Sequence, residues 1–220
     1  MQYPSTSPKL VIFDCDGVLV DSEPIFNRVL HEFLRSCGAG LSFSECCDLF
    51  IGKSMHDVER YLSNQGIIVP ENWSANFYEL ALEALRQEVT PIQGARGVLN
   101  KLMCAEVPFC VASNGSMAMM YVTLERTEML PWFEGNMFSA HEVGLSKPAP
   151  DVFLHAAEIN GIRPEHCVVI EDSASGFEAA ANAGMNCFAY IPKGTKPVVD
   201  LYGARQFCDM GLLPEMLGIT

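Results

Sequence analysis

Two aspartates stand two positions apart directly after a short apolar run near the start of the chain. The run Lys9–Phe13 is typical of a buried parallel strand, and Asp14 and Asp16 follow it at once. In extended chain these two side chains project from one face, where they repel each other unless a cation or a proton lies between them. Mg²⁺ prefers hard oxygen ligands and keeps positions open for water and phosphate. The pair therefore predicts a magnesium site; taken alone, D-x-D-G also fits a solvated turn.

Groups suited to an anion follow a second apolar run, Val107–Ala112. The chain continues there with Ser113, Asn114 and Gly115, whose hydroxyl, amide and backbone N–H groups can surround a phosphate. Further along, Lys147 stands between a short loop and two prolines, where a fixed ammonium can bind a phosphate.

A third apolar run, Cys167–Ile170, ends in Glu171 and Asp172, again two carboxylates after a predicted strand. In open α/β sheets, ligands bind beyond the carboxyl ends of the strands. Each of these polar stretches could separately be a turn or a helix cap. Together they have the residue types that a metal–phosphate site requires, and we therefore expect them to form one site.

Alternating strands and helices must position these residues. A fourth strand-like run is Cys187–Ile191, and helical periodicity lies between the runs, as in 98–103 and 153–159. This alternation predicts an α/β fold with a doubly wound parallel sheet, similar to a Rossmann fold.

The stretch 21–90 differs, because it has helical periodicity and almost no strand signal. Its apolar residues form three helical faces that begin at Ile25, Met55 and Phe77. We expect a catalytic α/β core made of residues 1–20 and 91–220 and an inserted helical cap made of residues 21–90. Turn-forming residues in 17–21 and 90–94 are the expected hinges.

Composition limits the partners. The chain of 220 residues has 14 Lys and Arg against 27 Asp and Glu, a formal charge of −13, which argues against nucleic acid or an anionic membrane surface as a partner.

The chain's nine cysteines are an odd number without a C-x-x-C pair, so neither a disulfide framework nor a zinc site is indicated. The N-terminus has no signal-peptide pattern. We expect a cytoplasmic protein.

Four motifs resemble those of the haloacid dehalogenase superfamily, in the branch of β-phosphoglucomutase and small sugar-phosphate phosphatases. They are F-D-C-D-G-V-L-V-D-S-E, V-A-S-N-G-S, S-K-P-A-P-D-V-F and V-I-E-D-S-A-S-G, in the family's order. The resemblance covers nearly the whole chain. It implies a Mg²⁺-dependent enzyme that acts on a small phosphorylated metabolite.

The resemblance also implies roles for individual residues. Asp14 matches the nucleophile that becomes an aspartyl-phosphate, and Asp16 matches the general acid and base. Ser113 and Lys147 match the groups that hold the phosphoryl oxygens. The implied Mg²⁺ ligands are Asp14, Asp16 through its carbonyl, Glu171 and Asp172.

Four further residues are expected to bind substrate. Asn114 and Gly115 lie beside Ser113, whereas Glu23 and Lys53 lie in the cap, in segments that select the substrate in the resembling family.

Three functions follow from this resemblance. The leading one is a phosphatase, and its substrate is expected to be a sugar phosphate or a phosphosugar acid such as 6-phosphogluconate. The first alternative is a phosphosugar mutase, which is disfavoured because Phe26 and Met55 stand where mutases carry a His and an Arg. A catalytically silent sugar-phosphate-binding module is an alternative from another class.

Overall fold

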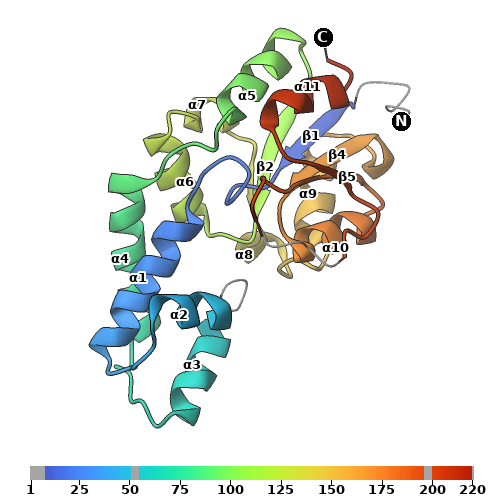
Figure 1. Cartoon of the computed structure of the whole chain (residues 1–220). Helices are drawn as coiled ribbons and strands as arrows, with labels where there is room; N and C mark the ends of the chain where they lie inside the picture. The colour runs from blue at the N-terminus through green and yellow to red at the C-terminus, as the bar shows by residue number, and fades with distance from the viewer. Residues whose placement is uncertain (1–7, 51–54, 196–199, 220) are drawn as a thin grey trace. The chain divides into compact units, whose positions relative to one another are not determined.

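The computed structural model describes residues 8–50, 55–195 and 200–219 of the chain (Figure 1). Two compact units form, one from Met1–Asp21 and Thr90–Thr220 and the other from Ser22–Val89. The first unit is an α/β core and the second is helical.

The core unit is built on a six-stranded sheet with the strand order β3-β2-β1-β4-β5-β6, in which all neighbouring strands are parallel. The strands are β1 (Leu10–Phe13), β2 (Phe109–Ser113), β3 (Met137–Ser139), β4 (Cys167–Glu171), β5 (Asn186–Tyr190) and β6 (Arg205–Phe207). The predicted doubly wound α/β fold is confirmed.

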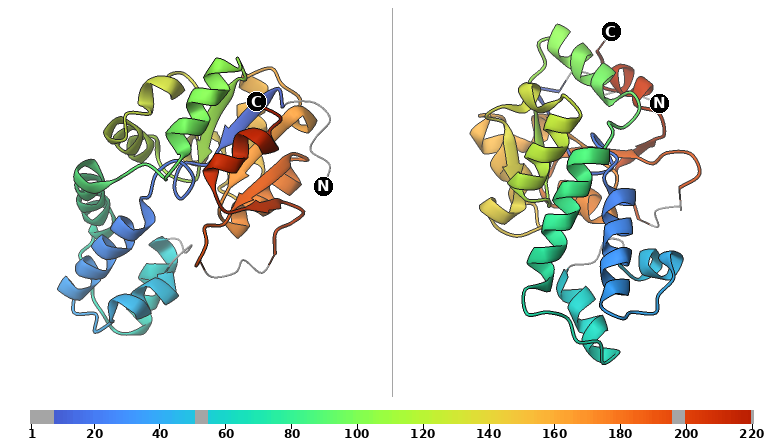
Figure 2. Two further views of the ribbon diagram at one scale, coloured as in Figure 1. Left: turned by 45° about the horizontal axis from the view of Figure 1, so that its top comes forward. Right: turned by 90° about the vertical axis from the view of Figure 1, so that its left-hand side faces the viewer.

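Helices connect the strands and cover both faces of the sheet (Figure 2). They are α5 (Ala95–Cys104), α6 (Met117–Arg126), α7 (Leu130–Phe133), α8 (Ala140–Val143), α9 (Asp151–Ile159), α10 (Ala174–Asn182) and α11 (Leu213–Met216), with the 3₁₀ turns η1 (Pro164–His166) and η2 (Met210–Leu212). Because both faces are covered, β1 can be apolar throughout, and its four residues are at most 1% exposed. One continuous cluster of buried residues packs α9 and α10 against the strands.

The sequence analysis missed β3 and β6, the two outermost strands of the sheet. Each has only three residues, and each mixes polar with apolar side chains. An edge strand has a single neighbour and needs no long apolar run, so the signal that marks a buried central strand is absent from both.

The helical unit consists of α1 (Glu23–Ser36), α2 (Phe43–Phe50), α3 (Met55–Asn64) and α4 (Trp73–Glu88). Its buried apolar residues form a separate cluster. Phe77 is fully buried within it, and its ring meets that of Phe26 edge-on at a centroid distance of 4.9 Å and that of Phe33 at 6.1 Å. The unit therefore has a core of its own.

Within the α/β unit, the two chain segments that border the helical insertion lie side by side. The N–H of Asp21 donates to the carbonyl of Thr90 at 2.9 Å, and the N–H of Ile92 donates to the carbonyl of Leu19 at 2.9 Å. The loop before them turns tightly at Gly17, which has a φ of +81°, a conformation that glycine adopts without strain.

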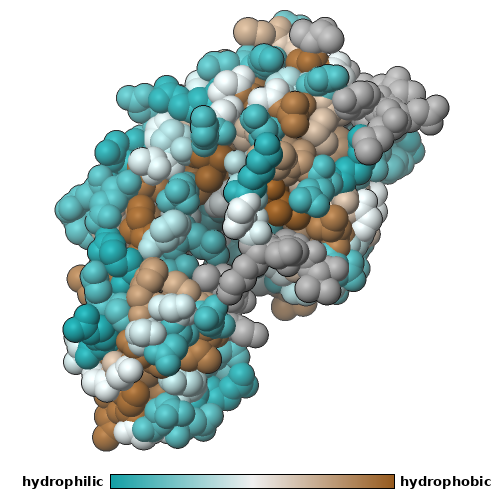
Figure 3. Space-filling model, in the orientation of Figure 1, coloured by the Kyte–Doolittle hydropathy of each residue, from teal (hydrophilic) through white to brown (hydrophobic). Residues whose placement is uncertain are grey.

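Hydrophilic side chains cover much of the face drawn in Figure 3, with hydrophobic residues between them. None of the helices in the described part of the chain is long and apolar enough to span a membrane.

We predict that Phe77→Ala destabilises the protein by about 3–5 kcal/mol, because it removes a fully buried ring and leaves a cavity. Leu80→Ala on the same helix is the control. Leu80 is 54% exposed, and its loss should change stability by less than about 0.5 kcal/mol. Urea unfolding followed by circular dichroism measures both variants, and equal losses would contradict the prediction.

Candidate active site

The candidate site lies where β1, β2 and β4 end. In the sheet register, Phe13 at the end of β1 pairs with Val111 on one side and with Ile170 on the other. The chain reverses its direction of winding at β1, so a crevice opens beyond the carboxyl ends of these strands. Asp14 and Glu171 stand at that edge.

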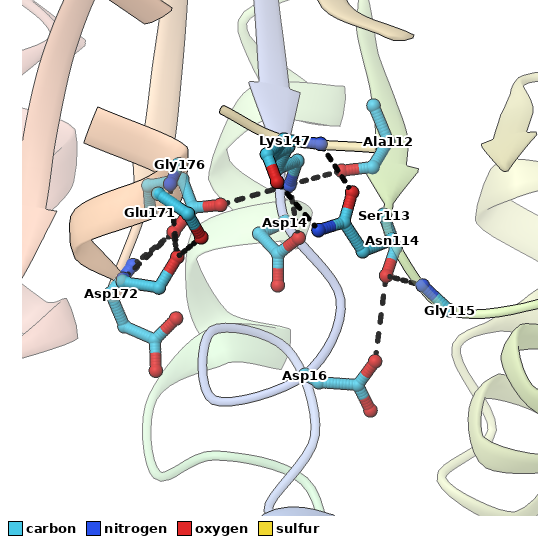
Figure 4. A network of polar contacts seen from close by, with 12 residues as sticks. Asp14, Asp16, Ala112, Ser113, Asn114, Gly115, Lys147, Glu171, Asp172 and Gly176 are labelled. Atoms are coloured by element: carbon cyan, nitrogen blue, oxygen red, sulfur yellow. Dashed lines mark hydrogen bonds and ion pairs between the residues drawn. The ribbon is translucent and has the colours of Figure 1, made fainter. Parts of the chain in front are cut away.

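Lys147 is the centre of a buried network (Figure 4). Its Nζ donates to Asp14 Oδ1 at 2.5 Å, to Glu171 Oε1 at 2.8 Å and to the carbonyl of Ala112 at 3.0 Å. Its side chain is 2% exposed, and Nζ also lies 4.6 Å from the centre of the Phe153 ring. The three hydrogen bonds match the three protons of an ammonium group, so the position of this cation is fully determined.

Asn114 holds the backbone of the loop that carries this lysine. The N–H of Lys147 donates to Asn114 Oδ1 at 2.8 Å, and Asn114 Nδ2 donates to the carbonyl of Lys147 at 3.4 Å. The end of β2 and the lysine loop are thereby joined, although they are far apart in the sequence.

The charge of the network depends on whether Asp14 is ionised. Burial raises the pKa of Asp14 to about 8; Lys147 opposes this shift, whereas Glu171 and Asp16 reinforce it. Burial also acts to lower the pKa of Lys147, but Asp14 and Glu171 together outweigh it and raise that pKa. We conclude that Lys147 stays charged. With Asp14 ionised as well, one ammonium would face two carboxylates. This excess of negative charge adds to burial in raising the pKa of Asp14, and a bound cation would favour the ionised form.

Glu171 has both carboxylate oxygens engaged. Oε1 accepts from Lys147, while Oε2 accepts from the N–H groups of Asp172 and Ser173 at 2.8 Å each and from the Ser173 hydroxyl at 3.0 Å. A Cβ at Gly176 would lie 1.9 Å from this carboxylate, so only glycine fits there. The first turn of α10 therefore fixes where Glu171 points.

Asp172 lies against the loop that follows β1. A Cβ at Gly17 would stand 2.0 Å from Asp172 Oδ2, which places this carboxylate directly beside the Asp16–Gly17 peptide. Asp14 and Asp172, with the carbonyl of Asp16, thus supply hard oxygen donors of the kind that Mg²⁺ takes.

Within the described residues, no three His, Cys, Asp or Glu side chains converge on one metal-binding position. Mg²⁺ does not require such a set, because it is commonly held by one or two carboxylates, with water and substrate phosphate completing its shell. The donors present therefore fit this ion.

Ser113 and Asp16 face each other across the site (Figure 4). The Ser113 hydroxyl lies 3.5 Å from Asp16 Oδ2, and its oxygen accepts the N–H of Gly115 at 2.9 Å. Cys15, between the two aspartates, is buried on the other side, with Sγ 3.9 Å from the Thr123 hydroxyl.

The structure gathers eight of the predicted site residues around this edge of the core sheet, namely Asp14, Asp16, Ser113, Asn114, Gly115, Lys147, Glu171 and Asp172. Glu23 is the first residue of α1 in the helical unit and is exposed. Lys53 lies outside the described residues.

The sequence patterns assign none of Gly17, Gly176 and Ser173 to the site, although they place Gly17 in an expected hinge. Their contacts depend on the approach of α10 and of the β1 loop to the two acidic side chains. Small residues next to acidic ones were the available signal, but turns and helix caps contain the same combination.

Comparisons with known proteins show which family this chain is similar to. Residues 8–184 match a family model described as haloacid dehalogenase-like hydrolase. The chain is 29% identical over 209 residues to the 6-phosphogluconate phosphatase of Escherichia coli, and the match covers 94% of this chain and 93% of that protein.

Solved structures agree. A haloacid dehalogenase-like protein of unknown function from Agrobacterium tumefaciens has a TM-score of 0.81 and 32% identity, over 96% of this chain and 97% of that one. A family hydrolase from Deinococcus radiodurans, solved with bound phosphate and sodium, has a TM-score of 0.79 and 31% identity, over 98% and 99% of the two chains. The family model covers most of the chain, and the chain therefore belongs to the haloacid dehalogenase-like hydrolase family.

Proposed function

We propose that this protein is a Mg²⁺-dependent phosphatase that hydrolyses a small phosphorylated metabolite through an aspartyl-phosphate. The observation that carries the proposal is the buried Asp14 carboxylate, held at 2.5 Å by a fixed Lys147 beside Ser113 and Asp16. A nucleophile, a phosphate-binding cation, a hydroxyl donor and a second carboxylate are the parts that phosphoryl transfer requires.

Asp14, Asp172 and the carbonyl of Asp16 would hold the metal. When bound, Mg²⁺ neutralises charge on the transferring phosphoryl oxygens. The sequence analysis also predicts Glu171 as a ligand. Its hydrogen bonds favour a different role, in which Glu171 keeps Lys147 in place.

The proposed reaction has two steps. An Asp14 oxygen attacks phosphorus and the bond to the substrate oxygen breaks, while Asp16 gives its proton to the departing alcohol. Asp16, now a carboxylate, takes a proton from water as the water attacks the aspartyl-phosphate, which releases inorganic phosphate and restores both aspartates. Lys147 and the Ser113 hydroxyl stabilise the phosphoryl oxygens throughout.

For the substrate we propose a sugar phosphate or a phosphosugar acid. The similarity to the 6-phosphogluconate phosphatase extends over nearly the whole of both chains and supports this class. Phe26 and Met55, at the positions where mutases carry a His and an Arg, favour transfer to water over transfer to a second sugar hydroxyl. A panel of phosphorylated metabolites, with phosphate release and sugar-phosphate isomerisation measured in parallel, separates these reactions.

We predict that Asp14→Asn lowers kcat on p-nitrophenyl phosphate by on the order of 10³-fold or more, because an amide is a poor nucleophile. The melting temperature should change by only a few degrees, since the amide has nearly the shape of the carboxylate. Substantial turnover by a folded Asp14→Asn protein would exclude the aspartyl-phosphate.

We also predict that EDTA abolishes the activity of the wild-type protein and that added Mg²⁺ restores it.

We predict that Gly176→Ala lowers kcat more than tenfold, because the new methyl group must displace the Glu171 carboxylate that holds Lys147. Shortening the acid should make room, so the double variant Gly176→Ala with Glu171→Asp should recover part of the loss. Gly97→Ala is the control, because a Cβ there meets nothing within 4 Å. If both alanine variants lose activity equally, the contact between Gly176 and Glu171 has no catalytic role.

We predict that Glu23→Ala and Lys53→Ala change the relative kcat/KM values among phosphorylated sugars and leave p-nitrophenyl phosphate hydrolysis within about twofold. A contact with the sugar affects only substrates that have one. Steady-state kinetics on both substrate types measures this difference. Equal losses on both would contradict a role in substrate selection.

A further inference from the structure

Ser139 is a fully buried polar residue that the proposed reaction does not use. It is the last residue of β3, and in the sheet register it pairs with Ser113, the last residue of β2. Its hydroxyl donates to the carbonyl of Gly115 at 2.7 Å and accepts the N–H of His141 at 3.2 Å. The contact with His141 caps the short helix α8, but capping does not account for the bond to Gly115.

Ser139 and Ser113 both form hydrogen bonds with the backbone of Gly115, one at its carbonyl and the other at its N–H. Ser139 binds the carbonyl of Gly115, and the N–H of Gly115 donates to Ser113 Oγ at 2.9 Å. A hydroxyl has a single proton to donate. Because the Ser113 oxygen accepts from Gly115, the orientation of that residue limits where the Ser113 proton can point.

The Ser113 hydroxyl proton points toward Asp16, at the candidate site. Asp16 Oδ2 lies 3.5 Å from Ser113 Oγ and accepts its hydrogen bond (Figure 4). In the proposed reaction, the phosphoryl group would bind on this side of Ser113. A Cβ on Gly115 would lie 3.2 Å from Ser113 Oγ and 3.3 Å from Asp16 Oδ2, so the loop is packed closely against both groups. A small rotation of the Gly115 backbone would therefore move the Ser113 hydrogen bond.

We propose that Ser139 is a positioning residue that directs the Ser113 hydroxyl toward a phosphoryl oxygen by holding the carbonyl of Gly115. This inference rests on the proposed function, in which Ser113 binds the phosphoryl group. Ser139 acts through Gly115 and Ser113 and does not itself touch the substrate.

The test compares Ser139→Ala with Ser139→Thr, which keeps the hydroxyl, and with Ser116→Ala as the matched control. Ser116 lies in the same loop and caps α6 by accepting the N–H of Met119 at 3.3 Å, so its loss reports the cost of a missing cap alone. For each full-length protein, calorimetry gives the Kd of inorganic phosphate with Mg²⁺ present. Steady-state kinetics on p-nitrophenyl phosphate gives kcat and KM, and thermal unfolding gives the melting temperature.

We expect Ser139→Ala to weaken phosphate binding and to lower kcat/KM, each by about tenfold, the order of one well-placed hydrogen bond. Ser139→Thr should restore most of both values. Ser116→Ala should lose a similar amount of thermal stability and keep its phosphate affinity.

The proposal is overturned if Ser139→Ala binds phosphate as tightly as the wild type, or no more weakly than Ser116→Ala. If Ser139→Thr does not fold, because its methyl group has no room, the comparison of the two alanine variants decides. Should the wild-type protein bind phosphate without hydrolysing any ester, the proposed function fails, and the Kd values alone decide the role of Ser139.

Discussion

The rest of the core depends on the ion pairs that the buried Lys147 ammonium makes with Asp14 and Glu171. Removing one charge from water is costly, and it is tolerated here because three acceptors meet the three N–H groups. Each acceptor comes from the end of a different strand, β1, β2 or β4. The sheet order that brings these three ends together is therefore also the condition for placing the charge.

The acidic side chains around this cation are held by elements that carry no charge themselves. Gly176 gives Glu171 its space, and Gly17 does the same for Asp172. Asn114 ties the lysine loop to β2 through backbone contacts on both sides of Lys147. Most of the groups that orient the proposed catalytic residues are thus small residues and main-chain atoms, and Glu171, which holds Lys147, is the charged exception.

The sequence predicts the central strands and the charged site residues because both leave local signals. β1 is apolar throughout and β4 is apolar up to its last residue, Glu171, and an aspartate follows each strand at once. β3 has three residues and no such run, so nothing in the sequence marks its last residue, Ser139. Ser139 matters through its contact with Gly115 on the neighbouring strand end, and a contact between separate segments leaves no pattern within either one. Gly176 matters because α10 packs against the Glu171 side chain, a closeness that the short spacing of the two residues does not reveal.

The backbone hydrogen bond between Asp21 and Thr90 bears on which part of the chain can be lengthened, shortened or exchanged. The two ends of the helical insertion leave the core side by side, joined by hydrogen bonds of 2.9 Å, and the insertion has its own buried cluster. A segment with adjacent ends and an independent core can be lengthened, shortened or exchanged without altering the strands. The insertion is in this sense a replaceable module. The proposed selection of substrate by Glu23 and Lys53 would then reside in the part of the chain that can change while the strand ends stay the same.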